Sequence, residues 1–273
     1  MSLYLNCRTG AVGGAIVSDP YVLEGEGTVV PVEMQMLGWS IPAERIAGRT
    51  VVFAVHGFNV SYAAGVQTLA QVERALNLGP GYVFVGVLWP GDYWIPVVNY
   101  PAEAGDAVRC GQLVARFVNE RLRAAAAVSF LSHSLGGRVV LEAVTHLERR
   151  AREVCLTAPA VDDDCLGTAQ YSAARANADR VSVLASTSDK VLRLAYPVGD
   201  FISDVLYDHD SPWRLALGYH GPRPLGLDHV APAQIPAAQG YDHGDYFSTT
   251  SRATRSERFM SEALQGLPHA WPP

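Results

Sequence analysis

Residues 132–137 read Ser-His-Ser-Leu-Gly-Gly and directly follow a short apolar run. A serine at a sharp turn between a strand and a helix is pushed toward a substrate, and the start of the helix places a backbone N–H beside it. Ser134 is therefore the predicted nucleophile. Gly136 supplies the small residue that this crowded turn requires, whereas Ser132 stands where glycine is usual. The competing interpretation is an ordinary strand-to-helix turn, which serine and glycine also mark.

A second apolar run, at 51–55, ends in His-Gly-Phe-Asn. Attack by a serine on an acyl group creates a negatively charged oxygen, and each fixed N–H donor stabilises the transition state by about 3 kcal/mol. The backbone N–H groups of Leu135 and Phe58 are the predicted donors, because one follows the nucleophile and the other lies in the loop after this early strand. His56 and Asn59 are expected to hold that loop by hydrogen bonds.

A carboxylate follows a later apolar run, at 181–185, through a short polar loop. Asp189 is the predicted acid, because the order along such a chain is nucleophile, acid, histidine, and because a carboxylate holds the tautomer of the imidazole. The competing interpretation is that Asp189 caps a helix that starts at Lys190. The aspartates at 162–164 come one strand too early and are expected to cap their own loop.

Eight histidines compete for the role of general base. Four follow the predicted acid and precede the proline-rich tail: His209, His220, His229 and His243. His243 is preferred, because it comes after the last expected strand, at 225–230, and before the final expected helix. His229 is the alternative, although it also fits within that last strand.

Short and almost continuously apolar runs, separated by helical or loop stretches, predict an α/β fold with a mostly parallel central sheet and helices on both faces. The predicted strands are 51–55, 82–88, 127–131, 153–157 and 181–185, after a β-rich opening at 28–37. Helical spacing of apolar residues predicts the helices 63–76, 104–122, 135–150 and 252–264. The predicted nucleophile, acid and base all follow strands, so they should gather at the carboxyl edge of the sheet.

Length and composition favour one domain over residues 1–273, since no composition shift marks a boundary. Two stretches, 89–101 and 196–238, lack periodicity but are rich in aromatic residues and proline, and they are expected to line the site. The segment 159–180 is too short for a large helical cap, so only a minimal cap is expected. The residues expected to contact substrate are His56, Gly57, Asn59, His133, Trp89, Tyr93 and Trp94.

Charge and composition exclude several classes of function. A net charge of −6 argues against a nucleic-acid footprint, and no apolar run reaches the length of a membrane span. The first ten residues carry no secretory signal, so a cytoplasmic protein is expected. The four cysteines lack paired or zinc-binding spacing and are expected to be buried free thiols. Arg149, Arg150 and Arg152 are expected to end a helix and to complement its dipole.

Five segments together resemble a bacterial family of α/β hydrolases of unknown function, DUF900, which is related to lipases and esterases. They are His-Gly-Phe-Asn at 56–59, the serine motif at 132–137, Ala-Pro-Ala-Val-Asp at 158–162, Ser-Thr-Ser-Asp-Lys-Val-Leu at 186–192 and Asp-His-Gly-Asp-Tyr at 242–246. The resemblance implies the α/β-hydrolase fold and supports His243 as the base. In the superfamily that the sequence resembles, haloalkane dehalogenases and epoxide hydrolases use an aspartate as the nucleophile. A serine at the turn therefore argues against their chemistry.

The predicted reaction is hydrolysis of a carboxylic ester through an acyl-enzyme on Ser134, with no metal or organic cofactor. The aromatic surroundings favour a small apolar ester as substrate. Two alternatives stay open. An acyltransferase would pass the same acyl group to an alcohol or amine, and a binding module would keep the fold without catalysis.

Overall fold

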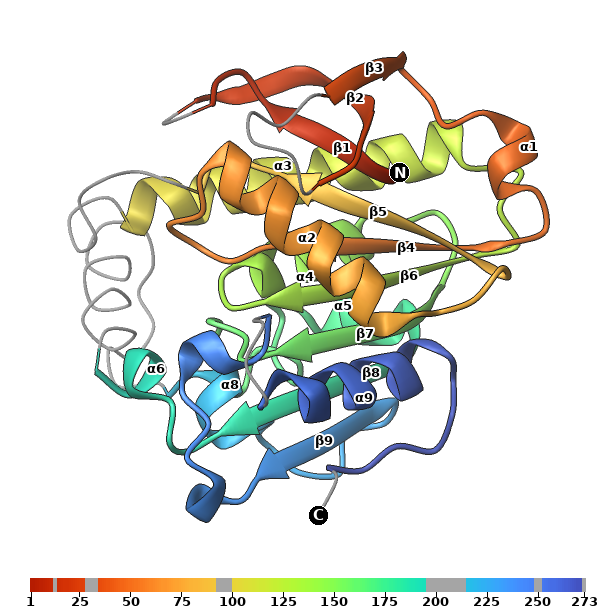
Figure 1. Ribbon diagram of the computed structural model, residues 1–273. Coiled ribbons are helices and arrows are strands. Elements are labelled where there is room, and N and C mark those ends of the chain that lie inside the picture. Colours follow the sequence, from red (N-terminus) through yellow and green to blue (C-terminus); the bar gives the residue numbers. More distant parts are fainter. Residues whose placement is uncertain (12–13, 28–33, 92–99, 195–214, 248–251, 272–273) are drawn as a thin grey trace.

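The computed structural model describes residues 1–11, 14–27, 34–91, 100–194, 215–247 and 252–271. Within these residues a nine-stranded sheet runs in the order β3-β2-β1-β5-β4-β6-β7-β8-β9 (Figure 1). The strands are β1 (Ser2–Arg8), β2 (Ile16–Gly25), β3 (Met34–Gly38), β4 (Thr50–Val55), β5 (Tyr82–Leu88), β6 (Ala127–His133), β7 (Ala151–Thr157), β8 (Ala178–Ser186) and β9 (Val230–Ile235). Strand β1 and strands β4 to β9 are parallel, and β2 is antiparallel to both β1 and β3. The predicted mostly parallel sheet is thus confirmed.

The five predicted parallel strands are present, but the predicted strand at 225–230 is wrong, because β9 begins where that segment ends. Gly226 and His229 have φ angles of 79° and 66°, which an extended strand does not contain. Of the predicted opening at 28–37, the described part forms β3. Strands β1 and β2 were not predicted. The residues of β1 alternate between apolar and polar, as in a strand with one solvent-exposed face, yet all seven are buried.

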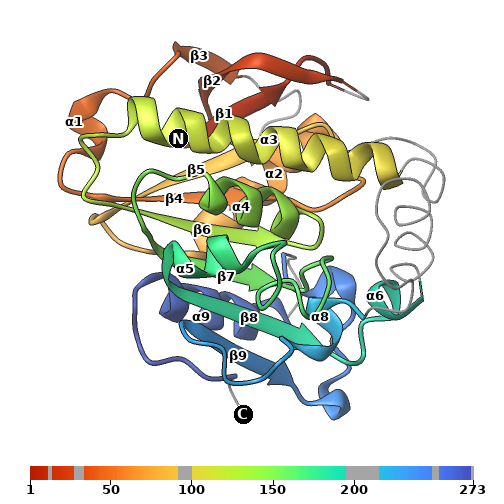
Figure 2. The ribbon, with the colours of Figure 1, turned by 180° about the vertical axis from the view of Figure 1, so that it is seen from behind.

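Helices cover both faces of the sheet (Figures 1 and 2). They are α1 (Ala43–Ile46), α2 (Tyr62–Leu76), α3 (Tyr100–Arg121), α4 (Gly136–Thr145), α5 (Ser172–Ala176), α6 (Lys190–Leu194), α8 (Leu217–His220) and α9 (Ala253–Leu264), with short 3₁₀ turns η1 (Ala237–Gln239) and η2 (His243–Asp245). Helices α2 and α9 pack together on one face, and α3 and α4 pack together on the other (Figures 1 and 2). No helix in the described ranges is long and apolar enough to cross a membrane.

Helix α4 is shorter than predicted and ends at Thr145. The side chain of Asn177 donates to the carbonyls of Val144 and Leu147, and these bonds satisfy the open end of the helix. The arginines at 149–152 therefore follow the helix rather than ending it, so their predicted interaction with its dipole is wrong.

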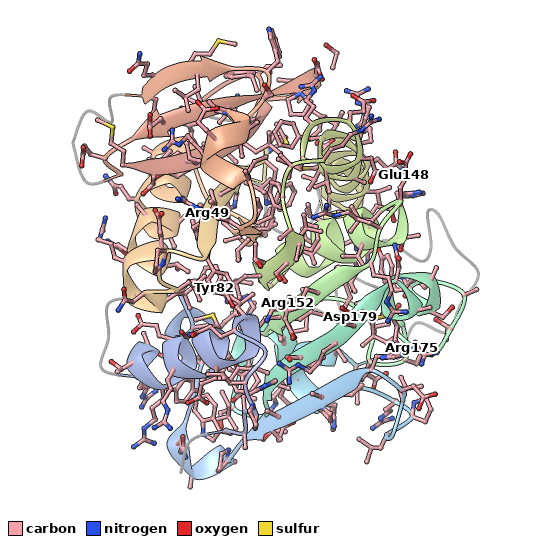
Figure 3. All side chains as sticks on the ribbon, turned by 90° about the vertical axis from the view of Figure 1, so that its right-hand side faces the viewer. Arg49, Tyr82, Glu148, Arg152, Arg175 and Asp179 are labelled. Carbon is pink, nitrogen blue, oxygen red and sulfur yellow. The ribbon has the colours of Figure 1, made fainter. Side chains whose placement is uncertain are left out.

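Charged and polar residues occupy the end of the sheet where the parallel strands begin (Figure 3). Arg49 and Tyr82 flank the starts of β4 and β5, and Arg152 and Asp179 lie at the starts of β7 and β8. Asp179 pairs with Arg150 at 2.8 Å. The predicted nucleophile, acid and base lie at the opposite end, after their strands.

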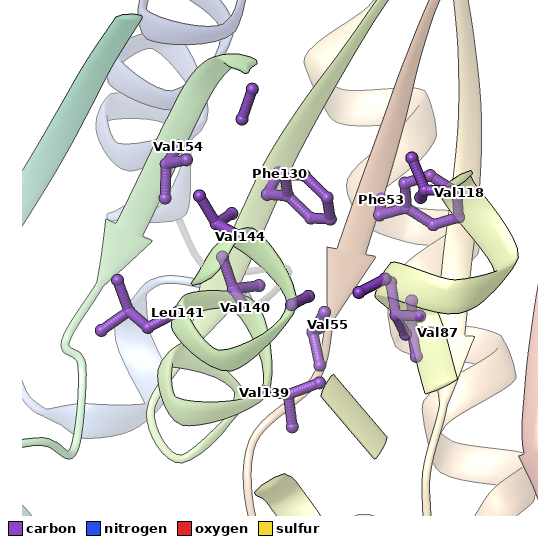
Figure 4. Packing of buried hydrophobic residues seen from close by; sticks show 14 of the residues in the cluster. Phe53, Val55, Val87, Val118, Phe130, Val139, Val140, Leu141, Val144 and Val154 are labelled. Atoms are coloured by element: carbon purple, nitrogen blue, oxygen red, sulfur yellow. The ribbon is translucent and has the colours of Figure 1, made fainter. Parts of the chain in front are cut away.

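Apolar packing of α4 on the sheet fixes the helix that follows the nucleophile. Val139, Val140 and Val144 are fully buried; Val140 and Val144 lie near Phe130 of β6, and Val139 lies near Val55 of β4 (Figure 4). The rings of Phe130 and Phe53 stack at 5.7 Å. Burial of each such side chain contributes about 1.5–3 kcal/mol, so the start of α4 is held rigidly against the carboxyl end of β6. The four cysteines are also buried and free, as predicted.

Candidate active site

Ser134 occupies the turn between β6 and α4 with a φ of 55°. This left-handed conformation costs a non-glycine residue about 1–3 kcal/mol, and three backbone hydrogen bonds hold it. The N–H of Ser134 donates to the carbonyl of Thr157 at 3.1 Å, and its own carbonyl accepts from the N–H groups of Gly137 at 2.9 Å and Ala160 at 3.1 Å. The turn therefore presents the hydroxyl in one fixed direction.

Crowding around this turn explains its small residues. A Cβ on Gly136 would lie 2.6 Å from the carbonyl oxygen of His56, so only glycine fits there. Ser132 is fully buried, and its hydroxyl lacks a hydrogen-bond partner within the described residues. Its carbonyl accepts a 2.7 Å bond from the hydroxyl of Thr157. The turn thus has room for a serine in place of the usual glycine, but it does not use the hydroxyl.

Replacing Ser132 with alanine is expected to raise the free energy of unfolding by about 1 kcal/mol, because it removes a buried hydroxyl that has lost its water without gaining a partner. Thr157→Val is the matched control. It removes a buried hydroxyl that does make a hydrogen bond, and it should lower the free energy of unfolding by about 1 kcal/mol. Urea unfolding of both variants measures the two effects. Equal destabilisation by both would contradict the prediction.

A chain of hydrogen bonds links Ser134, His243 and Asp189. The Nε2 atom of His243 lies 2.8 Å from the Oγ of Ser134, and the Nδ1 atom of the same ring lies 2.7 Å from the Oδ2 of Asp189. The carboxylate accepts, so Nδ1 carries the ring proton and Nε2 is left to accept from the serine hydroxyl. Asp189 is fully buried and the His243 side chain is 17% exposed. This arrangement can draw a proton from the serine toward the imidazole.

The two interpretations of Asp189 from its sequence context coexist in the structure. Its Oδ1 accepts from the backbone N–H of Leu192 at 2.9 Å, in the first turn of α6, while Oδ2 faces His243. One carboxylate therefore caps the helix and holds the histidine. The cap fixes the direction in which the second oxygen points.

His243 lies in η2, a short turn closed by its own acidic residues. Asp242 and Asp245 form a reciprocal capping box, and the Oδ1 of Asp242 accepts from the N–H groups of His243 at 2.9 Å and Lys190 at 3.0 Å. Burial opposes ionisation of Asp242, but these two N–H groups and the Lys190 side chain hold the pKa of the carboxyl below its ordinary value. Asp242 therefore stays an acceptor and ties the histidine turn to the start of α6.

The predicted donor loop lies against the nucleophile turn. A Cβ on Gly57 would lie 3.0 Å from the Cβ of Ser134, so the backbone at this glycine passes directly over the serine. Phe58, the next residue, is half-buried. Leu135 caps the start of α4 beside the serine. In the hydrogen bonds among described residues, neither Phe58 nor Leu135 gives its N–H to a backbone carbonyl.

Replacing Gly57 with alanine is expected to lower the rate of ester cleavage by about 100-fold, because the added methyl group pushes the loop and its donor off the serine. The matched control is Gly105→Ala, where a Cβ meets no atom of the described residues within 4 Å and activity should be unchanged. Steady-state kinetics on 4-nitrophenyl acetate measures both. Wild-type activity in a folded Gly57→Ala protein would show that the loop supplies no donor.

His56 and Trp89, which were expected to contact substrate, lie in the interior. His56 is 1% exposed and Trp89 is fully buried. The indole N–H of Trp89 donates to the carbonyl of His56 at 2.9 Å, and the Nδ1 of His56 donates to the carbonyl of Gly57 at 2.9 Å. Both side chains therefore fix the donor loop, the role expected of His56. Asn59 takes part through its backbone, because its N–H donates to the carbonyl of Gly91.

The remaining predicted residues have different positions. The ring of His133 packs on that of His243, with centroids 4.8 Å apart. His229 is exposed and precedes β9, so it lies at the wrong end of that strand for a base. Tyr93, Trp94 and His209 lie outside the described residues. The described ranges contain no group of three or more histidine, cysteine or acidic side chains that would hold a metal ion.

The sequence profile of a family described as an α/β hydrolase of unknown function (DUF900) matches residues 41–209, more than half of the chain. This chain belongs to that family. The matched region of this DUF900 hydrolase includes Ser134 and Asp189 and ends before His243. Comparison with curated proteins gives no match.

Solved structures similar to this DUF900 hydrolase include other hydrolases. One is described as a predicted CIB-like hydrolase from Thermoplasma acidophilum, with 12% identity, a TM-score of 0.45, and coverage of 86% of this chain and 92% of the other. An inhibited esterase B from Lactobacillus rhamnosis gives 11% identity, a TM-score of 0.46, and coverage of 83% and 78%. A hyperthermophilic esterase from the archaeon Pyrobaculum calidifontis gives 13% identity, a TM-score of 0.46, and coverage of 81% and 77%.

Sequence reasoning on this DUF900 hydrolase missed the residues that hold the histidine turn. Ser186 donates to the carbonyl of Tyr241 at 2.8 Å, and Lys190 pairs with Asp242 at 3.3 Å. The pattern Asp-x-x-Asp at 242–245 is a signal that could have been found, because it resembles a capping box. No local pattern marks Ser186 or Lys190, since their partners are about 50 residues away.

Proposed function

We propose that this protein is a serine hydrolase that cleaves carboxylic esters through an acyl-enzyme on Ser134. The observation that carries the proposal is the continuous hydrogen-bond chain from the Ser134 hydroxyl through His243 to the buried Asp189. A serine hydroxyl is a weak nucleophile on its own. An imidazole that accepts its proton, oriented by a carboxylate, is the arrangement that activates it.

In the proposed first half-reaction, the Oγ of Ser134 attacks the ester carbonyl while its proton moves to the Nε2 of His243. The carbonyl oxygen becomes negative, and the N–H groups of Phe58 and Leu135 stabilise it. The tetrahedral intermediate collapses, the bond to the alcohol oxygen breaks, and the proton on Nε2 goes to the departing alcohol. The acyl group is then an ester of Ser134.

In the second half-reaction, water gives a proton to His243 and its oxygen attacks the acyl-enzyme. Collapse of the second intermediate releases the carboxylic acid and returns the proton to Ser134. Asp189 keeps its negative charge throughout and stabilises the imidazolium that forms twice in each cycle. Because Asp189 is buried, the attraction between its carboxylate and the imidazolium is stronger than it would be in water.

Apolar side chains beside the proposed nucleophile favour an uncharged substrate. Phe58 follows the glycine that touches Ser134, and Phe247 packs against His133 at 5.4 Å between ring centroids. Both phenylalanines are half-buried, so each still has exposed apolar surface. Such surface binds an acyl or alkyl group better than a charged one.

Reaction with a fluorophosphonate probe tests the proposal, because the probe bonds only to an activated serine. We expect one equivalent of label, located on Ser134 by peptide mass analysis, and hydrolysis of short 4-nitrophenyl esters. Unlabelled protein that reacts with the probe at Ser134 in one assay, and in another transfers the acyl group of the ester to added alcohol faster than to water, would indicate an acyltransferase. Folded protein that takes no label would overturn the proposal and favour a binding module.

A further inference from the structure

His133, the residue before the proposed nucleophile, donates from its Nε2 to the backbone carbonyl oxygen of His243 at 2.8 Å. A carbonyl only accepts, so the proton of the His133 ring is on Nε2. The ring also packs on His243, Tyr246 and Phe247, with centroids 4.8, 5.8 and 5.4 Å away. All of these contacts are with the one segment that carries the general base.

Two consecutive residues of the serine turn thus hold His243 at opposite ends. Ser134 contacts the imidazole through its Oγ, and His133 contacts the backbone carbonyl of the same residue. The turn itself is rigid, because backbone bonds to Thr157 and Ala160 fix it. The position of His243 relative to the serine is therefore set from within the turn that carries the serine.

Other anchors of the histidine turn come from different elements. Ser186 of β8 and Lys190 of α6 hold its start, on the same side as Asp189, and Arg252 pairs with Asp245 at 3.1 Å. These contacts set the spacing between base and acid. Among the described residues, His133 supplies the side-chain bond from β6 to the backbone of the histidine turn.

The charge of His133 suits this position. Burial, and next the nearby His243, lower the pKa of His133 to about 3, and the hydrogen bond to the His243 carbonyl only partly offsets them. His133 therefore stays neutral while His243 takes up and releases a proton. A second positive charge 4.8 Å away would oppose formation of the imidazolium.

We propose that His133 is a positioning residue that ties the backbone of the general base to the nucleophile turn, rather than a residue that binds substrate. The inference deepens the proposed function and rests on it, because a general base matters only if the serine reacts. Its consequence is kinetic. Loss of the bond lets His243 drift from the serine, and misplacement by about 1 Å costs about 100-fold in rate.

The test compares His133→Phe, which keeps a ring but has no donor, with His133→Gln, which keeps an N–H at a similar reach. With 4-nitrophenyl acetate, His133→Phe is expected to lower kcat about 10- to 100-fold with KM unchanged, and to slow fluorophosphonate labelling equally. His133→Gln should restore most of both rates. His146→Phe removes an exposed histidine that bonds to Glu142 and is the matched control, with activity unchanged.

Each outcome decides a different point. Wild-type protein that takes no label overturns the proposed function and this inference with it. Labelled wild type with an equally fast His133→Phe variant overturns the inference alone, as does a variant that raises KM but keeps kcat. Equal losses in the Phe and Gln variants would indicate packing rather than a hydrogen bond.

A measurement on the wild type keeps the inference testable if the Phe variant does not fold. Nitrogen-15 NMR of the His133 ring reports which nitrogen carries the proton at each pH. We expect Nε2 to be protonated and Nδ1 to be bare from neutral pH down to well below the ordinary pKa of histidine, about 6.5. A neutral His133 ring that carries its proton on Nδ1 would overturn the inference, because a bare Nε2 cannot donate to the carbonyl of His243.

Discussion

Replacing Ser134 with alanine is expected to abolish ester hydrolysis, with a loss of about 10⁴- to 10⁶-fold in kcat. The hydroxyl oxygen is the atom of this residue that forms the acyl-enzyme, and its proton is the one that His243 accepts in the attack step. Fluorophosphonate labelling should disappear with it. Residual activity comes from the donors and the binding surface alone, which still accelerate the reaction over water.

Ser132→Ala is the matched control for Ser134→Ala, since it removes the other serine of the motif. Ser132 lies two residues from Ser134, and its hydroxyl makes no hydrogen bond within the described residues. The hydrolytic rate of the Ser132→Ala variant should therefore equal that of the wild type. Both variants should stay folded, as checked by circular dichroism and urea unfolding. A Ser134→Ala protein that keeps most of its hydrolytic rate would place the nucleophile elsewhere.

The order of residues along the chain predicted much of the site. Ser134, Asp189 and His243 each follow a strand of a parallel sheet, and parallel strands bring their carboxyl ends to one edge whatever their separation in sequence. The hydrogen-bond distances of 2.8 and 2.7 Å agree with that reasoning from topology. Apolar runs buried on both faces also revealed β4 to β8, because their signal is local.

Other features depend on partners distant in sequence and left no local signal. Strand β1 is buried at all seven positions because β2 and β5 pair with it and helices cover it, although its sequence alternates. The large aromatic side chain of Trp89 suggests a pocket wall, yet Trp89 is buried and its indole N–H donates to the carbonyl of His56. In each case, contacts with residues distant in sequence decided the outcome.

Replacing Asp189 with asparagine is expected to lower kcat about 10⁴-fold, because an amide group does not hold the imidazole in the tautomer that accepts from Ser134 and does not stabilise the imidazolium. The fold should survive. The amide oxygen of asparagine can still accept from the N–H of Leu192, so the cap of α6 is kept. KM for 4-nitrophenyl acetate should change little, since Asp189 is fully buried.

Asp189→Ala removes both functions of the carboxylate, the cap of α6 and the bond to His243. Comparison with Asp189→Asn, which keeps the cap, separates the two functions. We expect it to match the Asn variant in kcat but to lose a further 0.5–2 kcal/mol of stability, roughly the cost of a lost helix cap. Asp179→Asn, at the opposite end of the sheet, is the control for the same chemical change and should leave activity intact. If Asp189→Asn kept its rate while Asp189→Ala lost only stability, the carboxylate would be a helix cap and the general base would act without it.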